Sequence, residues 1–169
     1  MDTSKYMFDY YMKQYSIDAE KSNGDIIKVF FKEITDANND DKKFIFSHLG
    51  DLTQGEIIIV DGIHWMITQE SEPVTHQSYG KMTCVRLIHL INFGIDKILN
   101  SNYGAIELGN QGLTGSQYPL QDGKMIVSLP LNENTIKIQT NDRIIKFNSA
   151  WKVELSKPQQ NIKISFHCI

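Results

Sequence analysis

Residues 55–69, GEIIIVDGIHWMITQ, decide the fold that we expect for this chain. Four β-branched aliphatic residues lead into Asp61 and Gly62, and a second apolar run begins at Ile63. Asp-Gly between two strand-forming runs is a strong β-hairpin signal, because the tight turn needs positive φ angles that these residues adopt easily. The stretch therefore predicts a two-stranded hairpin with its turn at Asp61 and Gly62.

A variant of this stretch occurs 86 residues further on, at residues 141–155, NDRIIKFNSAWKVEL. Both tryptophans of the chain, Trp65 and Trp151, occupy the same position in the two copies. Asn148 falls at the position of Gly62, and asparagine is the next most favourable residue for a left-handed turn. The remaining matched positions are Leu52 with Ile138, Glu56 with Asp142, Ile58 with Ile144, and Ile67 with Val153. We interpret the two stretches as one hairpin unit used twice, although any two hydrophobic hairpins share part of this pattern.

The matched apolar residues are the expected core. A large aromatic residue at the start of a hairpin's second strand is typical of a side chain that fills a small barrel. We expect Trp65 and Trp151 in this role, surrounded by Ile58, Ile144, Ile67 and Val153. The alternative is that the two indoles stack on nucleic-acid bases, as aromatic side chains of OB folds do.

The rest of the chain predicts a mainly β protein with one N-terminal helix, over residues 3–23. Residues 79–92 are expected to form one long strand, and residues 94–121 a long Gly- and Asn-rich loop with short strands around 104–108. Further strands are expected at residues 25–34, 43–46, 124–129 and 161–168. The pattern is typical of one or two small β-barrels.

The domain organisation follows from these elements. Residues 24–169 are the expected β-barrel domain, with possible sub-units at 24–93 and 122–169 joined by the loop at 94–121. We favour one composite domain, because neither half alone contains enough strands to close comfortably.

A tyrosine- and methionine-rich stripe marks the predicted helix. Tyr6, Met7, Tyr10 and Tyr11 repeat at three- and four-residue spacing. One interpretation is a helix that lies over a barrel mouth. The other is a contact face for a neighbouring subunit, because such side chains are enriched at interfaces.

Composition and motifs indicate no reaction centre. The net charge is -3, the sequence pI is about 5.9, and Arg86 and Arg143 are the only arginines, which argues against sequence-specific nucleic-acid binding. The five histidines show no metal-ligand spacing, and no nucleophile or phosphate-loop motif occurs. We expect Cys84 and Cys168 to be reduced structural thiols. No catalytic, cofactor-binding or metal-binding residue is predicted, and we expect a non-enzymatic protein without signal peptide or membrane span.

The first hairpin and the strand after it resemble head-to-tail joining proteins of tailed bacteriophages, also called head-closure or stopper proteins. The residues that carry this resemblance are Gly55, Glu56, Ile58, Asp61, Gly62, Trp65 and Ile67. The second copy resembles a segment common in structural proteins of phages that infect Gram-positive hosts.

The resemblance implies a β-barrel scaffold in the virion, made in the host bacterial cytoplasm. Such proteins form a homo-oligomeric ring between portal or adaptor and tail, with loops that close the DNA channel. Residues 70–78 and 94–121 are the candidate loops, and packaged DNA is a possible non-specific contact. The sequence leaves three alternatives open: another tail component (tail terminator, tube or baseplate protein), a nucleic-acid-binding β-barrel, and a small host-directed or regulatory protein.

Overall fold

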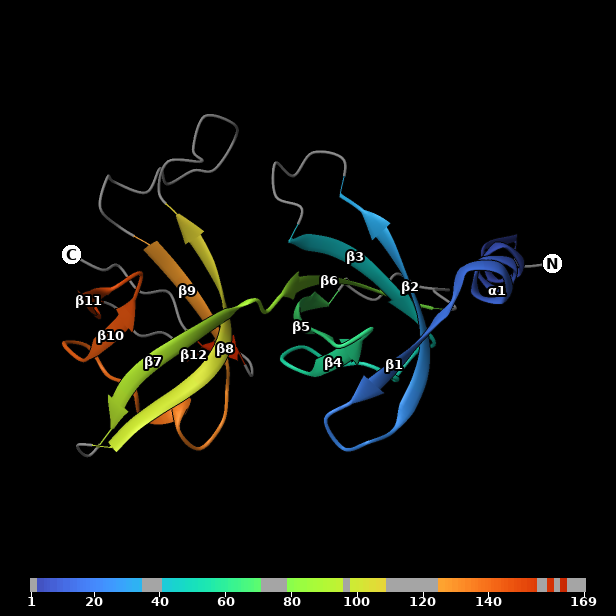
Figure 1. The fold of residues 1–169 in the computed structure, drawn as a ribbon. Helices are drawn as coiled ribbons and strands as arrows, with labels where there is room; N and C mark the ends of the chain where they lie inside the picture. The colour runs from blue at the N-terminus through green and yellow to red at the C-terminus, as the bar shows by residue number, and fades with distance from the viewer. Residues whose placement is uncertain are drawn as a thin grey trace. The chain divides into compact units, whose positions relative to one another are not determined.

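The chain divides into two compact units, Met1–Leu87 and Ile88–Ile169 (Figure 1). The structure is a computed structural model, and it describes residues 3–34, 41–70, 79–95, 98–108, 125–154, 158–159 and 162–163. Both units consist mainly of antiparallel β-strands, as the sequence predicted.

The first unit is a closed barrel with one helix attached. Its strands follow the order β1-β2-β3-β6-β5-β4, and β4 pairs with β1 to close the ring. The bounds of its elements are α1 (Thr3–Tyr15), β1 (Ile17–Lys21), β2 (Ile26–Glu33), β3 (Lys42–Ser47), β4 (Ile57–Val60), β5 (Ile63–Glu70) and β6 (Gly80–Arg86). The barrel encloses a core to which all six strands contribute, including the fully buried Val29, Ile45, Ile58 and Ile67. Alternation of buried and exposed side chains along the strands produces this core.

The second unit is a curled sheet with a 3₁₀ helix. Its strands follow the order β11-β10-β7-β8-β9-β13-β12. The bounds of its elements are β7 (His89–Ile95), β8 (Ile98–Leu108), β9 (Met125–Pro130), η1 (Thr135–Lys137), β10 (Arg143–Lys146), β11 (Ser149–Lys152), β12 (Pro158–Gln159) and β13 (Ile162–Lys163). Its core contains the buried Ile91, Phe93, Val127, Leu129 and Ile144.

The second unit repeats the strand order of the first. In each unit three consecutive strands form a meander, β1-β2-β3 and β7-β8-β9. The first strand of each meander pairs with the first strand of the tryptophan hairpin, β4 or β10, and the third strand pairs with β6 or β13. The first sheet also contains the β5–β6 pair that makes it a closed ring, whereas in the described residues the second sheet has no such pair and ends at β11 and β12. The repeat seen in the sequence therefore extends to the topology.

The first hairpin begins at a tight turn that an acidic side chain holds. The Glu56 carboxylate accepts a hydrogen bond from the Thr53 amide (2.6 Å), and the Glu56 amide donates to the Thr53 carbonyl (3.2 Å). Two backbone hydrogen bonds then clamp the hairpin at Ile67. The Ile67 carbonyl accepts from the Gly55 amide (2.8 Å), and the Ile67 amide donates to the Glu56 carbonyl (2.9 Å). Gly55 has a φ of 87°, which glycine adopts without steric cost.

The second hairpin repeats these bonds at every matched position. The Asp142 carboxylate accepts from the Gln139 amide (2.7 Å), and the Asp142 amide donates to the Gln139 carbonyl (3.1 Å). Val153 accepts from the Asn141 amide (2.7 Å) and donates to the Asp142 carbonyl (2.8 Å), and Asn141 has a φ of 78°. Within both hairpins the tryptophan lies opposite a buried isoleucine: Trp65 opposite Ile58, and Trp151 opposite Ile144. The two hairpins are thus one structural unit used twice.

The predicted turn residues lie at the tips of these hairpins. Asp61 and Gly62 have φ angles of 50° and 75°, and Phe147 and Asn148 have 52° and 57°. Two successive positive φ angles are the geometry of the tight turn that fits the twist of a hairpin.

Four expectations about boundaries need correction. The helix ends at Tyr15 instead of extending to residue 23, because residues 17–21 pair as β1 with β2 and β4. The long strand expected at 79–92 is two strands, β6 and β7, which belong to different units. The region expected to be a loop at 94–121 contains β8, which pairs with β7 over residues 98–104 and with β9 over residues 105–108, where short strands were expected; residues 96–97 and 109–121 lie outside the described residues. The units meet at residues 87 and 88, and the first barrel closes without strands from the second half.

Candidate functional site

The two tryptophans have different surroundings. Trp65 is 6% exposed within the core of the barrel, and its ring centre lies 5.0 Å from that of Phe31. Trp151 packs against the second core but stays partly exposed, and its indole N–H donates to the Lys146 carbonyl (3.0 Å). Trp65 fills a barrel, whereas Trp151 covers the side of a sheet. The buried Trp65 ring offers no face on which a base could stack.

The helix is anchored by residues other than the predicted stripe. Phe8 and Met12, one helical turn apart, are its buried side chains. Phe8 stacks on Tyr79, with ring centres 5.0 Å apart, and lies 6.2 Å from Phe30 on the outer face of β2. Sequence reasoning missed Phe8 and Met12 because the tyrosines dominate the apolar pattern, although the four-residue spacing of Phe8 and Met12 was visible.

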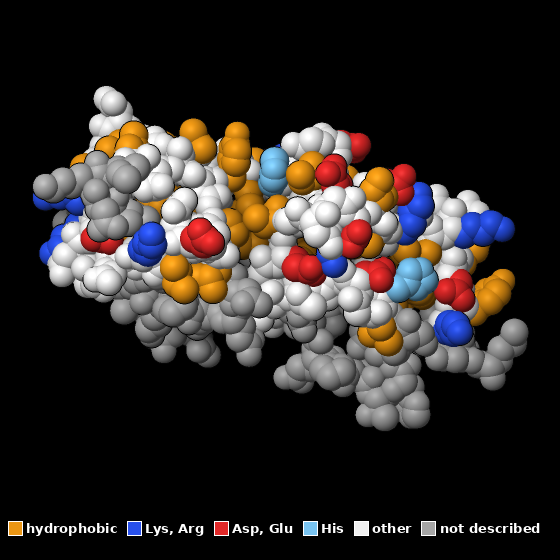
Figure 2. Space-filling model, turned by 90° about the horizontal axis from the view of Figure 1, so that it is seen from below, with side chains coloured by type: hydrophobic (Ala, Val, Ile, Leu, Met, Phe, Trp, Pro, Cys, Tyr) orange, Lys and Arg blue, Asp and Glu red, His pale blue; other side chains and the backbone are white. Residues whose placement is uncertain are grey.

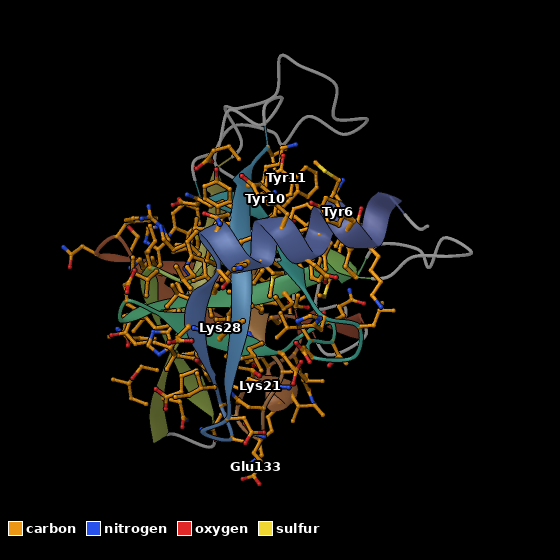
Figure 3. All side chains as sticks on the ribbon, turned by 90° about the vertical axis from the view of Figure 1, so that its right-hand side faces the viewer. Tyr6, Tyr10, Tyr11, Lys21, Lys28 and Glu133 are labelled. Carbon is orange, nitrogen blue, oxygen red and sulfur yellow. The ribbon has the colours of Figure 1, made fainter. Side chains whose placement is uncertain are left out.

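Tyr6 and Tyr10 lie on the opposite side of α1, where they are 63% and 49% exposed. At 100° per residue they are turned by about half a circle from Phe8 and Met12. Figure 3 labels Tyr6 and Tyr10 on α1, which lies across β2 in this view. We call the surface formed by these two tyrosines the helix patch.

Met7 and Tyr11, the other two residues of the predicted stripe, lie between the buried and exposed sides of α1. Together with Tyr15 they line a hollow of about 560 Å³ against Phe30, Phe46 and Tyr79. Phe30 and Phe46 stack with ring centres 4.6 Å apart across the β2–β3 pair. The structure therefore separates the predicted set into two side chains that line this hollow and two that face away from the barrel.

A second apolar surface lies on the outer face of the second sheet, and sequence reasoning did not identify it. Leu90 on β7 lies directly opposite Tyr103 on β8, and side chains of such a pair share one face. Ile145 on β10 lies on the same face, and Phe147 follows in the hairpin turn. All four are about half exposed, and we call them the sheet patch. Figure 2 shows hydrophobic side chains that reach the surface among charged and polar ones.

The described residues offer little that resembles a reaction centre. They contain no group of three or more His, Cys, Asp or Glu side chains that could hold a metal ion. Burial raises the pKa of Cys84 to about 12, so that its thiol is protonated at neutral pH and is a poor nucleophile. No helix in the described part of the chain is long and apolar enough to cross a membrane.

Comparison with known proteins links the second unit to phages. A family model described as the YomX C-terminal domain matches residues 90–156, which run from the second residue of β7 to beyond β11 and include the sheet patch. This is a phage-derived protein family. Neither the curated proteins nor the solved structures gave a match to the chain. The second unit is thus similar to a phage-derived domain.

Proposed function

We propose that this chain is a non-enzymatic structural protein of a phage virion, which forms an oligomeric ring at the head–tail junction. The match of residues 90–156 to a phage-derived domain is the observation that carries the proposal. In the ring, the protein connects the portal or adaptor to the tail and helps to close the DNA channel.

The surfaces of the two units support a role in assembly. A closed ring needs two different contact faces on each subunit, because head-to-tail contacts close by rotation. The chain has an exposed aromatic surface on each unit, the helix patch on the first and the sheet patch on the second. Tyrosine and other aromatic side chains are enriched in the buried centres of protein interfaces.

Labelling of purified phage particles tests this proposal. An antibody against the chain, visualised with gold in negative-stain images, is expected to mark the vertex where head and tail join. The same antibody, preabsorbed with the purified protein, is the control. Label along the tail or at its tip would favour the alternative, a tail terminator, tube or baseplate protein. Particles without any label would contradict a virion role altogether.

A further inference from the structure

The two sheets differ at one matched pair of outward positions. Ile59 and Ile145 correspond between the hairpins, and they pair with Glu20 on β1 and Asn92 on β7. Asp18 and Leu90 lie two residues before Glu20 and Asn92 on the same strands, so they occupy matched positions on the same outward faces.

At this position the first sheet carries an ion pair. Asp18 lies opposite Lys28, and their charged groups are 2.6 Å apart and well exposed. Lys28 is labelled on β2 in Figure 3. The second sheet instead places Leu90 opposite Tyr103, which are 46% and 47% exposed. At this matched pair of positions the first unit therefore presents charge to water and the second presents apolar side chains.

Phe147 adds an independent observation. It is 53% exposed and has a φ of 52°, at the turn position that Asp61 occupies in the first hairpin. A bulky aromatic residue is a clear exception in this left-handed region, where aspartate and asparagine are common. The tight turn requires a positive φ here, but a smaller polar residue would satisfy it with less strain than an exposed phenylalanine. The ring of Phe147 also lies 6.0 Å from that of His89, beside Leu90 in the chain.

An aromatic helix on an outer sheet face is a contact that this chain already makes. In the first unit α1 packs Phe8 against Phe30 and Tyr79. The second unit has no matching helix in front of its first strand, because only two residues separate the end of β6 from the start of β7. Its outer face nevertheless carries exposed apolar side chains, and the other face of α1 carries Tyr6 and Tyr10.

We propose that the helix patch of one copy of the chain packs on the sheet patch of a second copy. The contact is heterologous, so that each copy uses both patches and the assembly can extend or close into a ring. This inference rests on the proposed function, since it names the contact that would build the ring. Each patch consists of a few half-exposed side chains, and an interface of this size is expected to be weak in the free protein.

Sedimentation velocity over a range of protein concentrations tests the sheet patch. The double variant Leu90→Asp/Tyr103→Lys copies the ion pair of the first sheet, and is therefore expected to fold. We expect its self-association to be at least about tenfold weaker than that of the wild type, because the apolar surface is replaced by charge. Asp18→Asn/Lys28→Gln changes the matched position of the first sheet and is the control, with association unchanged. Circular dichroism checks the fold of each variant.

Mixing two variants tests the pairing of the two patches. Tyr6→Gln/Tyr10→Gln removes the helix patch, and each variant alone is expected to be monomeric. Mixed in equal amounts, the helix variant and the sheet variant should form a one-to-one dimer, because one intact helix patch meets one intact sheet patch. The dimer should not grow further. Homo-oligomers of either variant alone at wild-type strength would overturn the proposal.

Phe147→Asn separates binding from stability. Asparagine tolerates the left-handed turn better than phenylalanine, so the second unit should resist urea better while self-association weakens. If Phe147 had only a structural role, the substitution would lower the stability of the second unit and the self-association together.

Two outcomes distinguish this inference from the proposed function. A wild-type protein that stays monomeric at all concentrations, yet is found at the head vertex, would overturn the self-contact alone and indicate that another virion protein covers the patches. A protein that assembles through the two patches but is absent from virions would overturn the proposed function alone.

Discussion

The two tryptophan hairpins share a backbone and differ in what covers it. In the first hairpin, Trp65 and the next residue, Met66, are both buried, so both faces of β5 are covered. In the second, Trp151 is partly exposed and Lys152 is exposed, opposite an exposed Arg143. The inward residues, the turn and the acidic anchor are enough to define the hairpin. The outward residues are therefore free to follow the function of each unit.

Removal of the two indoles should give the largest difference between the hairpins. Trp65→Ala is expected to lower the free energy of unfolding of the first unit by about 3–5 kcal/mol, the usual cost of deleting a buried aromatic side chain. Trp151→Ala should cost the second unit roughly half as much, because less of its side chain leaves water. Hydrogen exchange of the full-length protein, followed by mass spectrometry, measures both units separately.

Equal losses in the two units would show that the surroundings of the tryptophans are alike after all. Trp151→Phe is the matched control for the indole N–H, and it should cost about 1 kcal/mol for the lost bond to the Lys146 carbonyl.

The acidic anchors should give a smaller and nearly equal effect. Glu56→Ala and Asp142→Ala each remove the carboxylate that accepts a backbone amide, at an expected cost of about 1–2 kcal/mol to their own unit. Glu56 also pairs with Lys21 at 3.0 Å, but partly exposed ion pairs add little. Asp142→Asn keeps an acceptor oxygen and should recover most of the loss. The same exchange measurement would refute the shared role if only one anchor affected stability.

The smallest expected effect is on the reactivity of Cys84, which is a sensitive measure of how often the barrel opens. Its thiol lies in the barrel core, and burial raises its pKa from 9.0 to about 12. A thiol reagent at pH 8 should therefore react only when the barrel opens, measured in a Cys168→Ser background. Glu56→Ala should accelerate this reaction, whereas Asp142→Ala in the second unit should leave it unchanged. Equal acceleration by both would indicate that the two units open together.

The pKa shift of Cys84 also has a predictable effect on stability. The unfolded thiol ionises near pH 9.0 and the folded one near pH 12. The unfolded state therefore loses its proton first, and the free energy of unfolding should fall as the pH rises from about 9 towards 12. Below pH 9 this contribution is fully present. Cys84→Ala should remove this part of the pH dependence.

The hairpins could be predicted from the sequence because their signals are local. Asp61, Gly62 and Asn148 favour the positive φ angles that the turns require, and aliphatic runs flank them. Short strands were expected only around residues 104–108, and the first part of β8 was expected to be a loop, because ILNSNYGAIEL contains several residues that favour turns. Gly104 in this strand has a packing reason: a Cβ there would lie 2.7 Å from Leu129 Cδ2 and 2.9 Å from the Ser128 carbonyl.

The errors have a common physical cause, which is that tertiary pairing decides what local patterns leave open. Residues 17–21, IDAEK, favour a helix as strongly as a strand, and pairing with β2 and β4 selects the strand. No glycine or proline separates β6 from β7, so that one apolar run concealed two strands. The sheet patch was missed because Leu90, Tyr103 and Ile145 come from three strands, and their common face depends on the register.

Each hairpin has a clamp of two bonds at its base, which joins residues 55 and 56 to residue 67 in the first hairpin and residues 141 and 142 to residue 153 in the second; this clamp has a consequence for engineering the chain. Both of its bonds join main-chain atoms, so that the alignment of each short ribbon is secured at the end opposite its tip. Outward side chains on such a ribbon can be exchanged in pairs, for charge, label or cross-linker, without sliding one strand past the other. The outward side chains of the second hairpin can therefore be changed to bind a new partner while its strand register stays the same.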